Sequence, residues 1–127
     1  MKNSIYVLIA TLCILTSCKK NSDNKPANNS RVLRYEVTGN FTGTLISSYT
    51  TASGGIANDQ ITLPWTKEIT YASSVTAANI VITGNSGVAG QKVSVVIKRG
   101  GTQLGMPTEM VVENSGSFSK PAPVVVF

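Results

Sequence analysis

Apolar and polar residues alternate one by one along several short stretches of this 127-residue chain. Near the start of one such stretch, Leu33, Tyr35 and Val37 are separated by Arg34 and Glu36. A side-chain period of two places the apolar residues on one face of a half-buried β-strand, whereas a helix needs a period of 3.6. No amphipathic stretch of helical period extends beyond a few turns, so the sequence predicts an all-β fold.

Further strand candidates follow, separated by turns that contain glycine, asparagine or proline. With the first at residues 32–38, the candidates cover 43–50, 65–71, 79–83, 91–98, 103–106, 109–113 and 117–127, and residues 56–63 carry the chain to the corner at Pro64-Trp65. About seven or eight short strands at this spacing are typical of an immunoglobulin-like β-sandwich. The apolar end, residues 124–127, is either a core strand, which we favour, or an exposed edge that pairs with another chain.

The single tryptophan follows a proline, and this pair fixes the start of one strand. Pro64 has no amide hydrogen, so it belongs at a strand start, an edge or a bulge. A strand that begins at Trp65 places Trp65, Ile69 and Tyr71 on one face. We interpret Trp65 as part of the core wall in preference to a ligand-stacking residue, because large aromatic side chains mostly serve packing.

The first residues have the order of an export signal. A lysine near the start precedes an apolar run of about ten residues, which is too short to span a bilayer. The run ends in Leu15-Thr16-Ser17-Cys18, which resembles the lipobox of bacterial lipoproteins. That resemblance implies cleavage before Cys18, lipid on its sulfur and acylation of the new amino group. Two or three acyl chains would give a stable membrane anchor.

The remaining organisation follows from that cleavage. Residues 1–17 are expected to be the signal peptide, with Leu15, Thr16 and Ser17 recognised by the peptidase. Residues 18–30 form a lipidated tether without large apolar side chains, and 31–127 form the sandwich domain. We expect a cell-envelope protein on the outer membrane facing the periplasm, with display at the cell surface as the alternative.

Cysteine and histidine usage excludes several kinds of site. Both cysteines, Cys13 and Cys18, precede the domain, and histidine is absent. The domain therefore lacks a disulfide, a cysteine metal site, the usual zinc ligand and the usual general base. Its acidic residues show no recognised catalytic spacing, and no phosphate loop or nucleophile elbow is present. We expect no enzyme activity, no metal and no cofactor. The acidic residues are Glu36, Asp59, Glu68, Glu109 and Glu113.

The net charge of +5 does not indicate a nucleic-acid partner. Four lysines lie in the first 25 residues, and from residue 31 onward seven basic and five acidic residues leave only +2. A nucleic-acid interface needs a basic stripe with interleaved aromatic residues, which this chain lacks.

An ordered series of five motifs resembles the MmpS family of actinobacterial membrane proteins. The motifs are Tyr-Glu-Val-Thr-Gly at 35–39, Ile-Ser-Ser-Tyr-Thr at 46–50, Leu-Pro-Trp-Thr-Lys at 63–67, Asn-Ile-Val-Ile-Thr-Gly-Asn-Ser at 79–86 and Val-Val-Ile-Lys-Arg-Gly-Gly at 95–101. The resemblance implies a small extracytoplasmic β-sandwich that accompanies exporters of the resistance-nodulation-division type.

Two departures from that family stand out. Its members are tethered by a transmembrane helix, whereas this chain resembles a lipoprotein. They also carry a cysteine pair in the last third, where this chain has Gln91 and, near the second position, Ser119 or Lys120. The fold carries over better than the partner, because a fold does not imply a function.

Two functions remain open at this point. The first is a non-enzymatic accessory or binding domain of the envelope, with a transporter subunit as the partner. The second is a surface lipoprotein that binds glycan or host protein. Exposed aromatic residues would favour the second, and Phe41, in the loop after Gly39-Asn40, is the one contact candidate.

Overall fold

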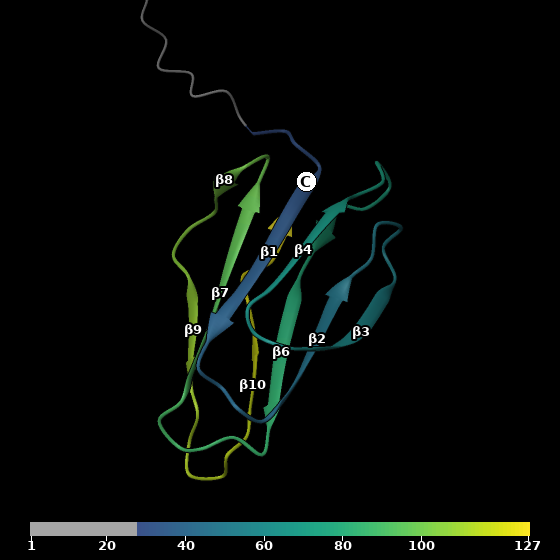
Figure 1. Ribbon diagram of the computed structural model, residues 1–127. Coiled ribbons are helices and arrows are strands. Elements are labelled where there is room, and N and C mark those ends of the chain that lie inside the picture. Colours follow the sequence, from purple (N-terminus) through teal and green to yellow (C-terminus); the bar gives the residue numbers. More distant parts are fainter. Residues whose placement is uncertain (1–27) are drawn as a thin grey trace, which may run out of the picture.

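The computed structural model describes residues 28–127, which form an all-β sandwich of two main antiparallel sheets (Figure 1). The first sheet has the order β4 (Trp65–Thr70), β1 (Val32–Gly39), β7 (Lys92–Arg99), with β8 (Thr102–Gln103) and β9 (Thr108–Val111) both paired to the other edge of β7. The second has the order β10 (Phe118–Pro121), β6 (Ile80–Asn85), β2 (Thr44–Thr50), β3 (Ile56–Ile61). Two short strands, β5 (Ala77–Ala78) and β11 (Val125–Val126), pair separately. The expected all-β sandwich is confirmed.

Strand β1 is the centre of the first sheet. It pairs with β4 on one side and with β7 on the other, so that Tyr35 lies opposite both Lys67 and Ile97. Leu33, Tyr35 and Val37 are fully buried, as their alternation predicted. Strand β6 is an inner strand of the second sheet, because it lies between β10 and β2.

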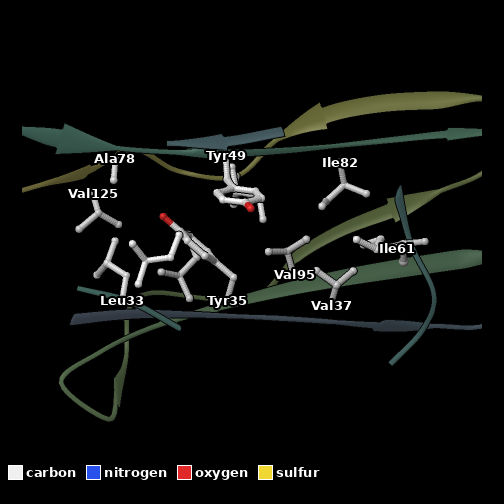
Figure 2. Close-up of a cluster of buried hydrophobic side chains, with 14 of the residues drawn as sticks. Leu33, Tyr35, Val37, Tyr49, Ile61, Ala78, Ile82, Val95 and Val125 are labelled. Carbon is white, nitrogen blue, oxygen red and sulfur yellow. The ribbon is translucent and has the colours of Figure 1, made fainter. Parts of the chain in front are cut away.

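The core forms where the inward faces of the two sheets meet. Figure 2 shows side chains of β1 and β7, among them Leu33, Tyr35 and Val95, pointing toward Tyr49 and Ile82 of the second sheet. Burial of one such aliphatic side chain stabilises the fold by about 1.5–3 kcal/mol relative to an exposed one. The core therefore depends on the period-two pattern in both sheets.

A buried chain of hydrogen bonds links the sheets through two tyrosines. The Tyr71 hydroxyl donates to the Thr50 carbonyl at 2.9 Å, and the hydroxyls of Tyr35 and Tyr71 lie 3.0 Å apart. Since Tyr71 donates to Thr50, Tyr35 donates to Tyr71. Burial is the main cause that raises the pKa of both phenols, so both stay neutral. By contrast, the buried Ser47 hydroxyl has no hydrogen-bond partner among the described residues.

The hairpin between β7 and β8 has a two-residue loop. Arg99 pairs with Thr102, and Gly100 and Gly101 between them both have positive φ, 54° and 85°. Positive φ at both loop residues is the geometry of a type I′ turn, which glycine adopts without strain.

Both ends of the described chain meet at one pole of the sandwich (Figure 1). The Phe127 ring contacts two guanidinium groups, with its centroid 4.4 Å from Arg31 Cζ and 5.1 Å from Arg99 Cζ. Arg31 also donates to the carbonyls of Tyr71, Ala72 and Val75, while Arg99 donates to the carbonyls of Ser30 and Val126. This clamp, Arg31–Phe127–Arg99, fixes the segment before β1 to the end of the chain.

Residues 124–127 form neither a fully buried core strand nor a fully exposed edge strand. Val125 is buried, Phe127 is half-buried, and Val124 and Val126 are exposed. Strand β11 pairs with β5, so one edge of its backbone is bonded within the chain. The stretch is a short, half-buried strand, with its alternate residues facing the core.

Candidate functional site

The lipobox residues Leu15, Thr16, Ser17 and Cys18 lie outside the described residues. The end of the expected tether, Asn28 to Ser30, lies within them and contacts the domain. The Asn28 side-chain amide donates to the Arg99 carbonyl, and Arg99 Nε donates to the Ser30 carbonyl at 2.7 Å. Whatever precedes Asn28 is therefore attached at the pole that carries the clamp.

Phe41 is not exposed, which corrects the expectation that it could contact a partner from a loop. Its side chain is 8% exposed, and its ring packs edge-on against the Phe118 ring with centroids 5.3 Å apart. Two glycines make room for this pair, because a Cβ at Gly84 would meet Phe118 and a Cβ at Gly87 would meet Phe41. Phe118 comes 77 positions later in the chain, so the residues flanking Phe41 could not reveal its burial.

Trp65 begins β4 as expected, and its ring faces inward but is only half-buried. It lies at the side of the sandwich where β3 and β4 form the sheet edges, next to Tyr49 at a centroid distance of 6.3 Å. Edge strands leave part of an inward side chain uncovered. Trp65 therefore packs against the core without being enclosed by it.

Asp59 and Lys67 close the same side by joining the two sheets. Asp59 accepts hydrogen bonds from the Tyr49 hydroxyl at 2.7 Å and from Lys67 Nζ at 3.0 Å. The Tyr49 hydrogen bond, followed by that of Lys67, holds the pKa of Asp59 below its ordinary value. The contact with Tyr49, whose ring lies beneath the ammonium group, and then the hydrogen bond to Asp59 raise the pKa of Lys67. Both groups are charged near neutral pH, which suits an ion pair and not a general acid.

Glu36, another of the candidate carboxylates, is held in ion pairs on the first sheet. Glu36 pairs with Arg34 and with Lys98, each at 3.0 Å, across the exposed face of the first sheet. In residues 28–127, no three side chains among histidine, cysteine, aspartate and glutamate gather as they would to hold a metal ion.

The opposite side of the sandwich contains a groove between the edge strands β9 and β10. It has a volume of about 470 Å³, and Met110 and Phe118 are among the residues that line it. Lys120 crosses it from β10, and its ammonium group donates to the Glu109 carbonyl of β9 at 2.8 Å. A shallower hollow of about 720 Å³ shares Glu109 and Lys120 with it. That hollow is mostly apolar, with Met106, Pro107, Pro121, Ala122, Pro123 and Val124 in its lining.

Backbone hydrogen bonds show which groups of β9 face outward. The Val112 amide donates to Gln91 and the Val112 carbonyl accepts from Gly90, so Val112 is bonded toward the β7 side. Bonding direction alternates along an antiparallel strand, which turns the N–H and C=O groups of Glu109 and Val111 away from β7. The bond from Lys120 to the Glu109 carbonyl agrees with this direction.

The free edge of β10 is less suited to pairing. The Ala122 amide donates to the Ile80 carbonyl, so the same alternation turns Ser119 and Pro121 outward. Pro121 has no amide hydrogen, and proline on an outward edge position blocks continuous strand addition. The edge of β9 is therefore the one that retains alternate donors and acceptors.

Sequence reasoning did not find this groove, because it arises from two strand edges that meet only in the folded domain. Two signals of these edges were present in the sequence. Glu109, Val111 and Glu113 alternate with Met110 and Val112, which predicts an outward face of charged, apolar and charged residues. Pro121 was a second signal, since it indicates an edge strand.

A comparison with protein families gives a match over most of the chain. A family model described as "Mycobacterium membrane protein" matches residues 5–103, which include the apolar N-terminal run and strands β1 to β8. The match ends before β9 and the groove. No curated protein matches this chain. Within residues 28–127, no helix has the length and apolar character that crossing a membrane requires.

Proposed function

The chain belongs to the Mycobacterium membrane protein family, the MmpS family, and on that premise we propose that it is a non-enzymatic accessory domain of the cell envelope. Lipid on Cys18 holds it at a membrane, and the sandwich docks on a subunit of an envelope transporter. The observation that carries this proposal is the extent of the match. It includes both the apolar N-terminal run and most of the sandwich.

The state of the carboxylates supports a non-enzymatic role. Asp59 and Glu36 are held in ion pairs between strands. A general acid at neutral pH needs a raised pKa, whereas the pKa of Asp59 is lowered. These groups stabilise the sandwich faces and do not prepare a proton transfer.

The arrangement of the pole supports an anchored domain. Asn28 and Ser30 are bonded to Arg99, so the anchor pulls on the domain at a defined place. The pole then faces the membrane, and the groove between β9 and β10 lies on the side of the sandwich, where an envelope partner can reach it.

The glycan-binding alternative gains less support from the described surface. Sugar rings usually stack on exposed aromatic side chains, but in residues 28–127 each aromatic side chain is buried or half-buried. The surface-lipoprotein function is therefore the second outcome of the experiment below and not a second proposal.

The test compares Cys18→Ala with Cys13→Ala in the native membranes, using a clickable palmitate analogue and detergent pull-down with mass spectrometry. We expect Cys13→Ala to keep the label and to recover a transporter subunit in stoichiometric amount, because that cysteine is removed with the signal. Cys18→Ala should lose the label and the membrane fraction. Label on Cys18→Ala would refute the anchor, and recovery of surface glycan-assembly proteins without a transporter would refute the accessory role.

A further inference from the structure

We propose that the outer edge of β9 is a strand-addition site, which binds an extended segment of a partner protein with basic side chains on either side of an apolar one. This inference rests on the proposed accessory function and names the surface that serves it. The groove lies outside the residues that match the family, so its properties come from this chain alone.

The backbone of β9 supplies the hydrogen bonds for such a segment. Glu109 and Val111 turn their N–H and C=O groups outward, and these are spaced as the next strand of a sheet requires. Recognition by strand addition takes its affinity from such main-chain bonds and its selectivity from alternate side chains. On the opposite side of the sandwich, hydrogen bonds from Tyr49 and Lys67 to Asp59 join the two sheets.

The side chains of β9, together with Glu113 two residues after its end, specify the charge of the segment. Glu109 and Glu113 are exposed and form no ion pair among the described residues, while Val111 between them is 55% exposed. Directly opposite cross-strand positions favour opposite charges and paired apolar side chains. A segment with lysine or arginine at two positions four apart, and valine or isoleucine midway, complements this face.

Lys120 protects the site when the segment is absent. Its ammonium group occupies the Glu109 carbonyl at 2.8 Å, which is the acceptor that the first amide of an added strand would use. Lysine on an open strand edge is a common device against unwanted pairing. Because the Lys120 side chain is exposed, it can move into water when the segment displaces it.

The alternate side chains of the segment point into the groove. Met110 and Phe118 line it, and its volume of about 470 Å³ admits small apolar or threonine side chains. The adjoining hollow beside Met106, which is 87% exposed, continues the apolar surface. The added strand would cover both.

The experiment uses the full chain in mild detergent micelles and a fluorescent peptide, acetyl-Thr-Lys-Thr-Val-Thr-Lys-Thr-amide. Anisotropy measures the dissociation constant, and amide NMR shifts locate the contact. One control peptide carries glutamate in place of both lysines, and another carries N-methyl groups on its alternate amides. We expect the unmodified peptide to bind and to shift the Glu109 and Val111 amides, and both controls to bind weakly.

Three variants extend the test. Glu109→Gln with Glu113→Gln should weaken binding by about five-fold and reduce its dependence on salt. Lys120→Ala should tighten it by about the same factor. The matched control Glu68→Gln, on the exposed face of β4 in the same sheet, should change nothing.

Two results would overturn the proposal. One is equal binding of the N-methylated and unmodified peptides, or shifts on β3 and β4 instead of β9. The other is lack of binding to both the unaltered chain and Lys120→Ala at about 1 mM peptide. The peptide binds without a transporter, so the two proposals fail separately. A failed pull-down would refute the transporter partner but not the strand-addition site. A failed titration would refute the strand-addition site but not the transporter partner.

Discussion

Substitution of Gly84 by alanine tests the packing between the groove floor and the core. Gly84 lies directly opposite Phe118 in the β6–β10 ladder, and the Phe118 ring covers it. A Cβ at Gly84 would lie 2.8 Å from Phe118 Cζ and still closer to Cε1. Ordinary carbon contacts are about 3.5–4.0 Å, so the ring must shift away from its edge-on contact with Phe41.

Two opposing terms set the expected magnitude. Forcing an extra methyl group into a packed site costs about 1–3 kcal/mol. The φ of Gly84 is not in the positive region, so alanine also restricts the unfolded chain, which stabilises by about 0.4–1 kcal/mol. The steric term is larger, and Gly84→Ala should lower the free energy of unfolding by about 1–2 kcal/mol.

The sign should reverse when the ring is removed. In a Phe118→Ala background the steric term disappears, and Gly84→Ala should then stabilise by up to about 1 kcal/mol. Urea denaturation of the four proteins measures this cycle. Gly55→Ala is the matched control, because a Cβ there meets only Thr51 Oγ1 at 3.3 Å. Equal destabilisation by Gly84→Ala in both backgrounds would refute the reasoning.

Four further outcomes follow from buried or paired polar groups. Tyr71→Phe removes the donor to the Thr50 carbonyl and the acceptor for Tyr35, so it should lower the free energy of unfolding in urea by about 1–3 kcal/mol. Tyr35→Phe should lower it by about 0.5–1.5 kcal/mol. The reverse order would contradict the assigned directions of the two hydrogen bonds. Ser47→Ala removes a buried hydroxyl without a partner and should be neutral or stabilise by about 1 kcal/mol; a clear loss would reveal a partner for that hydroxyl. Because the pKa of Asp59 is lowered on folding, the stability from this group is present above about pH 4 and is lost as the pH falls through the folded pKa. Tyr49→Phe removes the largest cause, so the Asp59 pKa read from its carboxyl carbon shift should rise, and an unchanged pKa would contradict that cause.

The period-two pattern predicted the strands and their inward faces because these are local properties. Leu33, Tyr35 and Val37 are buried, and β4 begins at Trp65, as the alternation and Pro64 indicated. How far an inward side chain is enclosed depends on neighbouring strands, which explains why Trp65 is only half-buried.

Properties that depend on contacts between residues far apart in the sequence were not predicted. Phe41 was placed at the surface because its neighbours form a loop, yet Phe118 covers it from β10. The groove likewise requires β9 and β10 to be edges on the same side, and no local pattern specifies which strands pair. The Lys120 contact with the Glu109 carbonyl is visible only once those edges are placed.

The position of β1 decides how the domain responds to force. A force applied to the chain at Asn28 acts first on the hydrogen bonds of Arg31 and Arg99. It then acts on the hydrogen-bond ladders that hold β1 to β4 and to β7 along most of the strand. Both ladders would be loaded in shear, with all their bonds strained together, whereas an edge strand can be peeled away one bond at a time. A domain that is held through a strand bonded on both edges would stay folded while a partner on β9 and an anchor at the pole pull in different directions.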